Sequence, residues 1–166
     1  MDSTSVADGP VTQIAWVVED IEAGERFLTT IMGVKGWMRM PDVHFGPEKC
    51  VYRGEAADFT AHISLGYSGD MQLELIQPVN GRSIYTEFLE RGGAGLHHIC
   101  LEPQDFDAAL KDAEARGIPV VQQGDMGGQM RFAYLDGADS GVPYIELAEI
   151  GPNMRAFFEQ IKKGAQ

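Results

Sequence analysis

The stretch Gln13-Ile14-Ala15-Trp16-Val17-Val18-Glu19-Asp20-Ile21 decides the fold, because His98-Ile99-Cys100-Leu101-Glu102-Pro103-Gln104-Asp105-Phe106 repeats its pattern. Each stretch begins with a side chain that can bind a metal ion, continues as an apolar run and reaches an aspartate seven positions later. A helical pattern follows each aspartate and ends at a glycine, Gly33 in the first copy and Gly117 in the second. We therefore expect two copies of one structural unit, related by a pseudo-twofold axis.

Each copy later contains an apolar run with a glutamate at its centre. These runs are Gln72-Leu73-Glu74-Leu75-Ile76 and Tyr144-Ile145-Glu146-Leu147-Ala148. A carboxylate in a covered strand is costly unless it is paired or binds a cation. Either glutamate alone is explained equally well by a half-exposed strand that turns it toward water. Because the two glutamates occupy equivalent positions in the repeat, a role as metal ligands is favoured for both.

Strand parity decides which side chains share a face. Gln13 lies on the same face as Ala15 and Val17, toward the concave side of a curved sheet, and His98 aligns with Gln13 whereas His97 does not. Taken alone, His98 is also compatible with a hydrogen-bonded core histidine and Gln13 with a surface position. Together the parity and the repeat predict that Gln13, Glu74, His98 and Glu146 meet at one point as a metal site.

The order of the predicted elements indicates an α+β fold. We expect one domain over residues 1–166, built from two βαβββ modules at about 11–80 and 94–150, with a linker helix at 83–91 and a C-terminal helix at 153–163. A generic α+β sandwich without symmetry is the alternative, but it leaves the matched spacing to coincidence. Residues 34–57 contain several prolines and glycines and give no clear division into elements.

Composition excludes several classes of function. The formal net charge of −12 argues against nucleic acid and anionic membranes as partners, and no apolar run is long enough to span a bilayer. The start of the chain, Met1 to Pro10, has no signal-peptide pattern and is predicted to be a flexible tail. Two cysteines, Cys50 and Cys100, do not form a disulfide framework, so a reducing cytoplasm is expected.

These residues resemble the vicinal oxygen chelate superfamily, which includes glyoxalase I, methylmalonyl-CoA epimerase and the bleomycin-binding proteins. The segment from Ile76-Gln77-Pro78 to Leu96-His97-His98-Ile99 is similar to the middle of the epimerase branch. The resemblance implies paired βαβββ modules in a cupped mixed sheet, a homodimer, and metal ligands at Gln13, Glu74, His98 and Glu146. Epimerases usually have histidine in the first strand, whereas the glutamine here is found in some glyoxalase I enzymes.

The predicted ligand set suits one divalent ion such as Zn, Co, Ni, Mn or Fe. Such an ion polarises a carbonyl group, so that a carboxylate can move a proton at the adjacent carbon. By resemblance to glyoxalase I, Glu146 is expected to act as both ligand and base. Asp58, Glu55 and His62 are candidates for the opposing acid, because the epimerase position for that group falls near them.

Three functions follow from this pattern. The first is a metal-dependent isomerase or epimerase acting on an acyl-CoA or keto compound, although the acidic chain weighs mildly against coenzyme A esters. The second is a glyoxalase I-like lyase acting on a thiol hemithioacetal, and the third is a non-catalytic binding protein of the same fold. Apolar side chains are expected to line the substrate pocket, namely Trp37, Met38, Met40, Phe45 and Met130.

Overall fold

The computed structural model describes residues 5–164, so residues 1–4 of the predicted tail lie outside the described part. The strands are β1 (Val11–Val17), β2 (Met38–Phe45), β3 (Cys50–Tyr52), β4 (Glu55–Ala56), β5 (Phe59–Ser68), β6 (Met71–Asn80), β7 (Gly95–Leu101), β8 (Val120–Asp125), β9 (Met130–Asp136) and β10 (Tyr144–Ile150). The helices are α1 (Ile21–Met32), α2 (Ile84–Gly92), α3 (Phe106–Ala115) and α4 (Pro152–Gly164), with a 3-10 turn at Ala138–Ser140. Within residues 5–164, no helix has both the length and the apolar composition needed to cross a bilayer.

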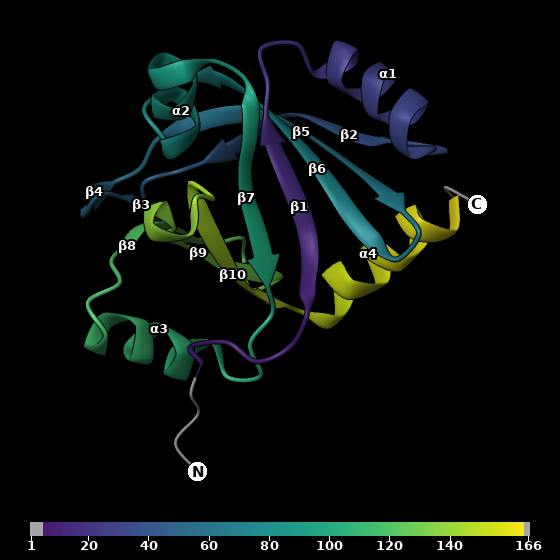
Figure 1. Cartoon of the computed structure of the whole chain (residues 1–166). Helices are drawn as coiled ribbons and strands as arrows, with labels where there is room; N and C mark the ends of the chain where they lie inside the picture. Colours follow the sequence, from purple (N-terminus) through teal and green to yellow (C-terminus); the bar gives the residue numbers. More distant parts are fainter. Residues whose placement is uncertain (1–4, 165–166) are drawn as a thin grey trace.

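The strands of the described residues form one ten-stranded mixed sheet in the order β2-β5-β6-β1-β7-β10-β9-β8-β3-β4. β1 and β7 run antiparallel in its middle, and each is flanked by a parallel strand, β6 beside β1 and β10 beside β7. Figure 1 shows β1 and β7 side by side, with α1 and α3 at opposite corners of the molecule. The predicted α+β fold of paired βαβββ modules in a cupped sheet is confirmed.

The repeat extends to the helix ends. The Asp20 carboxylate accepts a hydrogen bond from the Ala23 backbone N–H at the start of α1, and the Asp105 carboxylate accepts one from Ala108 at the start of α3. These are the two aspartates after which the sequence predicts a helix, and each satisfies a backbone donor that the helix leaves free. The same local signal, a capping aspartate, therefore starts the helix that follows β1 and the helix that follows β7.

Helix α1 packs on the sheet through a narrower face than its sequence indicates. Ile21 and Leu28 are buried against Leu75, whereas Phe27 and Ile31, two further apolar residues of the same helix, are more than 60% exposed. Gly24 lies on the packed face, where an added Cβ would be 3.2 Å from a Leu75 methyl group. The helix approaches the sheet through this glycine, and the close approach turns the Phe27 side of the helix to solvent.

Residues 34–57 cross from one module to the other. β2 is an edge strand that pairs with β5 and is interrupted between Met40 and Val43, where Asp42 has a φ of 52°. The following hairpin of β3 and β4 does not return to the first module but joins the far edge of the second, because β3 pairs with β8. The hairpin thereby extends the sheet around its concave side.

An ion pair holds this hairpin against α2. The Arg53 guanidinium donates to both carboxylate oxygens of Glu87 at 2.9 and 2.8 Å, and the Tyr52 hydroxyl donates to the same carboxylate. The hydrogen bonds from Arg53 lower the pKa of Glu87, although burial partly opposes them. The side chain of Glu87 is only 9% exposed, so this contact is better shielded from water than an ordinary surface pair.

We expect Glu87→Gln to lower the free energy of unfolding by about 1–2 kcal/mol at pH 7. Because the pKa of Glu87 is lower in the folded than in the unfolded chain, its contribution is complete above the unfolded value of about 4.3 and is lost as pH falls through the folded value. Urea denaturation between pH 3 and 7 measures the difference. Glu90, on the same helix as Glu87, forms an exposed ion pair with Arg82. Glu90→Gln removes this pair, and as the control it should change stability by less than about 0.5 kcal/mol. Equal losses in the two variants would contradict the role of Glu87.

Candidate metal centre

The register of the central strands places four polar side chains at equivalent positions. In the first module Glu74 pairs with Ala15, two residues after Gln13, and in the second Glu146 pairs with Cys100, two residues after His98. Because side chains two residues apart in a strand share a face, each glutamate lies beside the donor of its own module. The antiparallel pairing of β1 with β7 then brings the two halves together.

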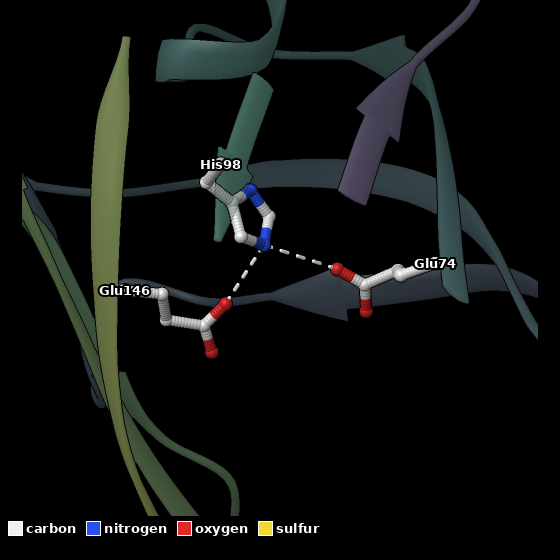
Figure 2. A group of neighbouring side chains, drawn as sticks. All are labelled: Glu74, His98 and Glu146. Carbon is white, nitrogen blue, oxygen red and sulfur yellow. Dashed lines mark ion pairs between the residues drawn. The ribbon is translucent and has the colours of Figure 1, made fainter. Parts of the chain in front are cut away.

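The four side chains meet around the imidazole of His98. Its Nε2 atom lies 2.9 Å from Glu146 Oε2, 3.4 Å from Glu74 Oε1 and 3.3 Å from Gln13 Oε1. Figure 2 shows the two carboxylates approaching His98 from opposite sides. Candidate ligand atoms of Glu74, His98 and Glu146 all lie within 4.8 Å of one another. The structure therefore brings together the four residues that the sequence singles out.

This cluster concentrates negative charge away from water. His98 is fully buried and Glu146 is 3% exposed. Burial raises the pKa of Glu74, although His98 opposes the shift. Burial alone would lower the pKa of His98, but the hydrogen bonds that it donates to Glu146 and Glu74 raise it to about 9. Two carboxylates around one imidazole require positive charge at their centre, and three oxygens with one nitrogen are a donor set that fits a divalent cation.

Two neighbours fix the orientation of these donors. Gln13 Nε2 donates to Gln72 Oε1 at 2.6 Å, and Gln72 in turn donates to the Tyr67 hydroxyl, so the Gln13 carbonyl oxygen faces the centre. His97 Nδ1 lies 2.8 Å from His98 Nδ1, and burial holds the pKa of His97 well below its usual value. We assign the proton between the two rings to His98 Nδ1, so that a bound cation would take the place of the proton on His98 Nε2.

Gln72 belongs to the site, although no sequence pattern singles it out. The available signal is its parity with Glu74, which places both on one face of β6. His97 can touch His98 because β7 has an irregular register at this point, where Ala15 pairs with His98 and Trp16 with Leu96. No local sequence pattern marks that irregularity.

An apolar cavity of about 130 Å³ opens beside the cluster. Gln13, Glu74 and Glu146 form its polar end, and most of the remaining walls come from three regions of the chain. These walls are Met40, Val43, Phe45, Ile63, Leu65 and Ile76 from the first module, Met126, Met130 and Phe132 from the second, and Met154, Phe157 and Phe158 from α4. Of the five residues predicted to line a pocket, Met40, Phe45 and Met130 do so, whereas Trp37 and Met38 line a separate surface hollow beside α4.

Two tyrosines also reach the cavity. The hydroxyls of Tyr85 and Tyr134 are 2.6 Å apart, and both side chains line the cavity wall. Burial and the nearby carboxylates raise both pKa values well above 10, so the hydroxyls stay protonated and can donate hydrogen bonds. The sequence indicates only core positions for them, because Tyr85 lies on an amphipathic helix and Tyr134 in an apolar strand.

The residues expected to supply the opposing acid lie outside the cavity. The side chain of Asp58 is 69% exposed, and its Oδ1 lies 2.7 Å from His44 Nε2. His62 Nδ1 accepts a hydrogen bond from the Asp42 backbone, and His62 projects from the opposite face of β5 to its neighbour Ile63, which lines the cavity. Glu55 is exposed on β4. The prediction that one of these residues faces Glu146 is not supported by their positions.

The chain is similar in sequence to known proteins of one superfamily. Residues 12–134 match the model of the family described as the glyoxalase/bleomycin resistance protein/dioxygenase superfamily. The mitochondrial methylmalonyl-CoA epimerase of Mus musculus is 28% identical over 144 residues, which cover 85% of this chain and 73% of that protein.

Solved structures of similar proteins carry the same fold. The methylmalonyl-CoA epimerase of Mycobacterium tuberculosis superposes with a TM-score of 0.65 at 19% identity, covering 94% of this chain and 97% of that one. A variant of the Streptomyces coelicolor epimerase in complex with 2-nitronate-propionyl-CoA superposes with a TM-score of 0.55 at 22% identity, covering 84% and 92% of the two chains. At these identities the likeness establishes the fold.

Proposed function

The chain belongs to the glyoxalase/bleomycin resistance protein/dioxygenase superfamily, and from this premise we propose that it is a metal-dependent isomerase or epimerase. The reaction is the transfer of a proton at a carbon next to a carbonyl group, as in methylmalonyl-CoA epimerase. The observation that carries the proposal is the convergence of Gln13, Glu74, His98 and Glu146 at the polar end of an otherwise apolar cavity.

The donor atoms fit a divalent cation. Gln13 Oε1, His98 Nε2 and one oxygen each of Glu74 and Glu146 would hold it, and Zn, Co, Ni, Mn and Fe all accept such a set. When bound, a divalent ion polarises a substrate carbonyl and favours loss of the adjacent proton. The protein provides a buried site in which this charge is weakly screened.

Glu146 is the residue we assign as the base. It is buried, lies at the cavity wall and carries a carboxylate that can accept a proton from a substrate carbon. Tyr85 and Tyr134 line the same cavity. One of their two hydroxyls donates its proton to the other, so the accepting hydroxyl keeps a proton that it can donate to a substrate oxygen. The apolar walls exclude water, which protects a carbanion-like state from uncontrolled protonation.

One alternative has a structural observation in its favour. Two carboxylates, an amide and an imidazole form a donor set that is neutral with a divalent ion, and this also suits the hemithioacetal substrate of a glyoxalase I-like lyase, whose reacting end is uncharged. Consumption of methylglyoxal in the presence of glutathione would favour that lyase. A protein that binds no divalent ion would favour a non-catalytic binding role.

The test begins with metal content. The protein purified without chelators is analysed for bound metals, and hydrogen–deuterium exchange at the α carbon of acyl thioesters and ketones is followed by mass spectrometry in deuterium oxide. Exchange that disappears on metal removal and returns on metal addition would support the proposal. Full metal occupancy without exchange in any α-acidic carbonyl compound would reject it.

Replacing Gln72 with leucine is expected to weaken divalent-metal binding by about 10- to 100-fold. The substitution frees the Gln13 amide, which can then turn its NH₂ group toward the centre. Calorimetric titration with Zn²⁺ measures the affinity. Gln123→Leu, at an exposed position of β8, is the matched control. An affinity for Zn²⁺ equal to that of the control would remove Gln72 from the site.

A further inference from the structure

The charge of the cavity defines which substrates it can accept. The ligand carboxylates of Glu74 and Glu146 offset both charges of a divalent cation, because Gln13 and His98 bind as neutral donors. Among residues 5–164, none that lines the cavity is a lysine or an arginine. A further carboxylate bound at this end would therefore be an uncompensated charge in an apolar environment, which is strongly unfavourable.

Two arginines, one from each module, are paired with carboxylates outside the cavity. Arg39 pairs with Glu22 and Glu25 on α1, and Arg131 pairs with Asp107 and Glu149. The net charge of −12 adds a long-range field that repels anions from the cavity. Neither short-range nor long-range electrostatics favours an acid at the reacting end of the substrate.

The walls favour an apolar substituent instead. Met40, Met126, Met130 and Met154 contribute flexible, polarisable side chains, which adapt to ligands of irregular shape. The cavity volume of about 130 Å³ is close to that of apolar protein cavities that accommodate benzene. A substituent of about four to six carbon atoms would fill it.

Resting on the proposed function, we infer that the substrate is a ketone or thioester whose reacting end is uncharged and carries an apolar substituent of this size. A malonyl-type substrate, with a free carboxylate on the reacting carbon, is disfavoured. The specificity of this chain thereby differs from what the names of its epimerase relatives indicate for those proteins.

A matched pair of probes tests this inference. In 2-butylacetoacetyl-pantetheine and 2-butylmalonyl-pantetheine the reacting carbon bears the same butyl group, and the two differ only in a methyl ketone against a carboxylate. Their dissociation constants are measured by calorimetry on the Zn²⁺-loaded protein. The uncharged probe is expected to bind about 10- to 100-fold more tightly. Equal affinities, a preference for the carboxylate, or binding of neither probe would overturn the inference.

A positive charge introduced into the cavity wall provides a second test of the substrate preference. Met40 is partly exposed on the edge strand β2, so a lysine there can reach the cavity without breaking the core. Met40→Lys should shift the preference toward the carboxylate probe by about tenfold or more, whereas Met40→Gln should retain the wild-type order. Circular dichroism and Zn²⁺ content confirm that each variant is folded. If Met40→Lys does not fold, the wild-type affinities alone decide.

Deuterium exchange on the same probes separates this inference from the proposed function. Tight binding of the uncharged probe without exchange above the rate in protein-free buffer would reject the isomerase while leaving the substrate class supported. Exchange in both probes with equal affinity would support the isomerase and overturn the substrate class.

Discussion

Glu146→Gln is expected to lower the rate of α-proton exchange by about 10²- to 10⁴-fold, the usual contribution of a positioned base. The amide oxygen of glutamine can still face a cation, but it cannot accept a proton near neutral pH. Because the side chain is buried and keeps its volume, the fold should persist. The rate is measured in deuterium oxide at saturating metal, so that weaker metal binding does not enter the comparison.

Glu149→Gln is the matched control for this experiment. Glu149 lies three residues further along β10, is about half exposed and pairs with Arg131 outside the cavity. Its replacement should change the exchange rate by less than about threefold, since an exposed ion pair contributes little. Near wild-type exchange in the Glu146→Gln protein at full metal occupancy would show that another group acts as the base.

His98→Ala is expected to weaken divalent-metal binding by more than about 100-fold, because even residues that only orient a ligand alter affinity by about 10- to 100-fold. His98 supplies the single nitrogen of the donor set and separates the two carboxylates. Its loss leaves Glu74 and Glu146 facing one another in a buried region, so the metal-free variant should also unfold at lower urea concentration. Calorimetry with Zn²⁺ and urea denaturation measure the two effects.

His62→Ala serves as the control and also tests an interpretation that the geometry does not support. His62 is partly exposed and projects away from the cavity, so its removal should leave Zn²⁺ affinity and exchange rate within about threefold of wild type. A large loss of exchange in this variant, with Zn²⁺ affinity retained, would restore His62 as a proton carrier.

Signals that act over a few residues were sufficient to predict much of the fold. Asp20 and Asp105 cap their helices because a side-chain oxygen reaches a backbone N–H three residues away, and Gly33 ends α1 in the left-handed conformation that glycine favours. The alternation of side chains in a strand placed Gln13 and His98 on the concave face. The repeat then paired each with a glutamate, and the strand register brings all four together.

Contacts between distant segments decided the rest. The hairpin of β3 and β4 joins the second module through β8, about 70 residues further along the chain, and no local pattern specifies that partner. The position of Asp58 outside the cavity, and the positions of Tyr85 and Tyr134 inside it, depend on how the sheet curls and where α2 packs.

The sequence by itself determined the repeat, the helix boundaries set by Asp20 and Asp105, and the faces of the candidate ligands, because backbone hydrogen bonding and strand alternation are local properties. Only the tertiary structure decided which other groups share the cavity with those ligands, how large it is, and that no lysine or arginine of the described part of the chain lines it. These features arise from packing between segments far apart in the chain, where the neighbours of a side chain are chosen by the curvature of the whole sheet.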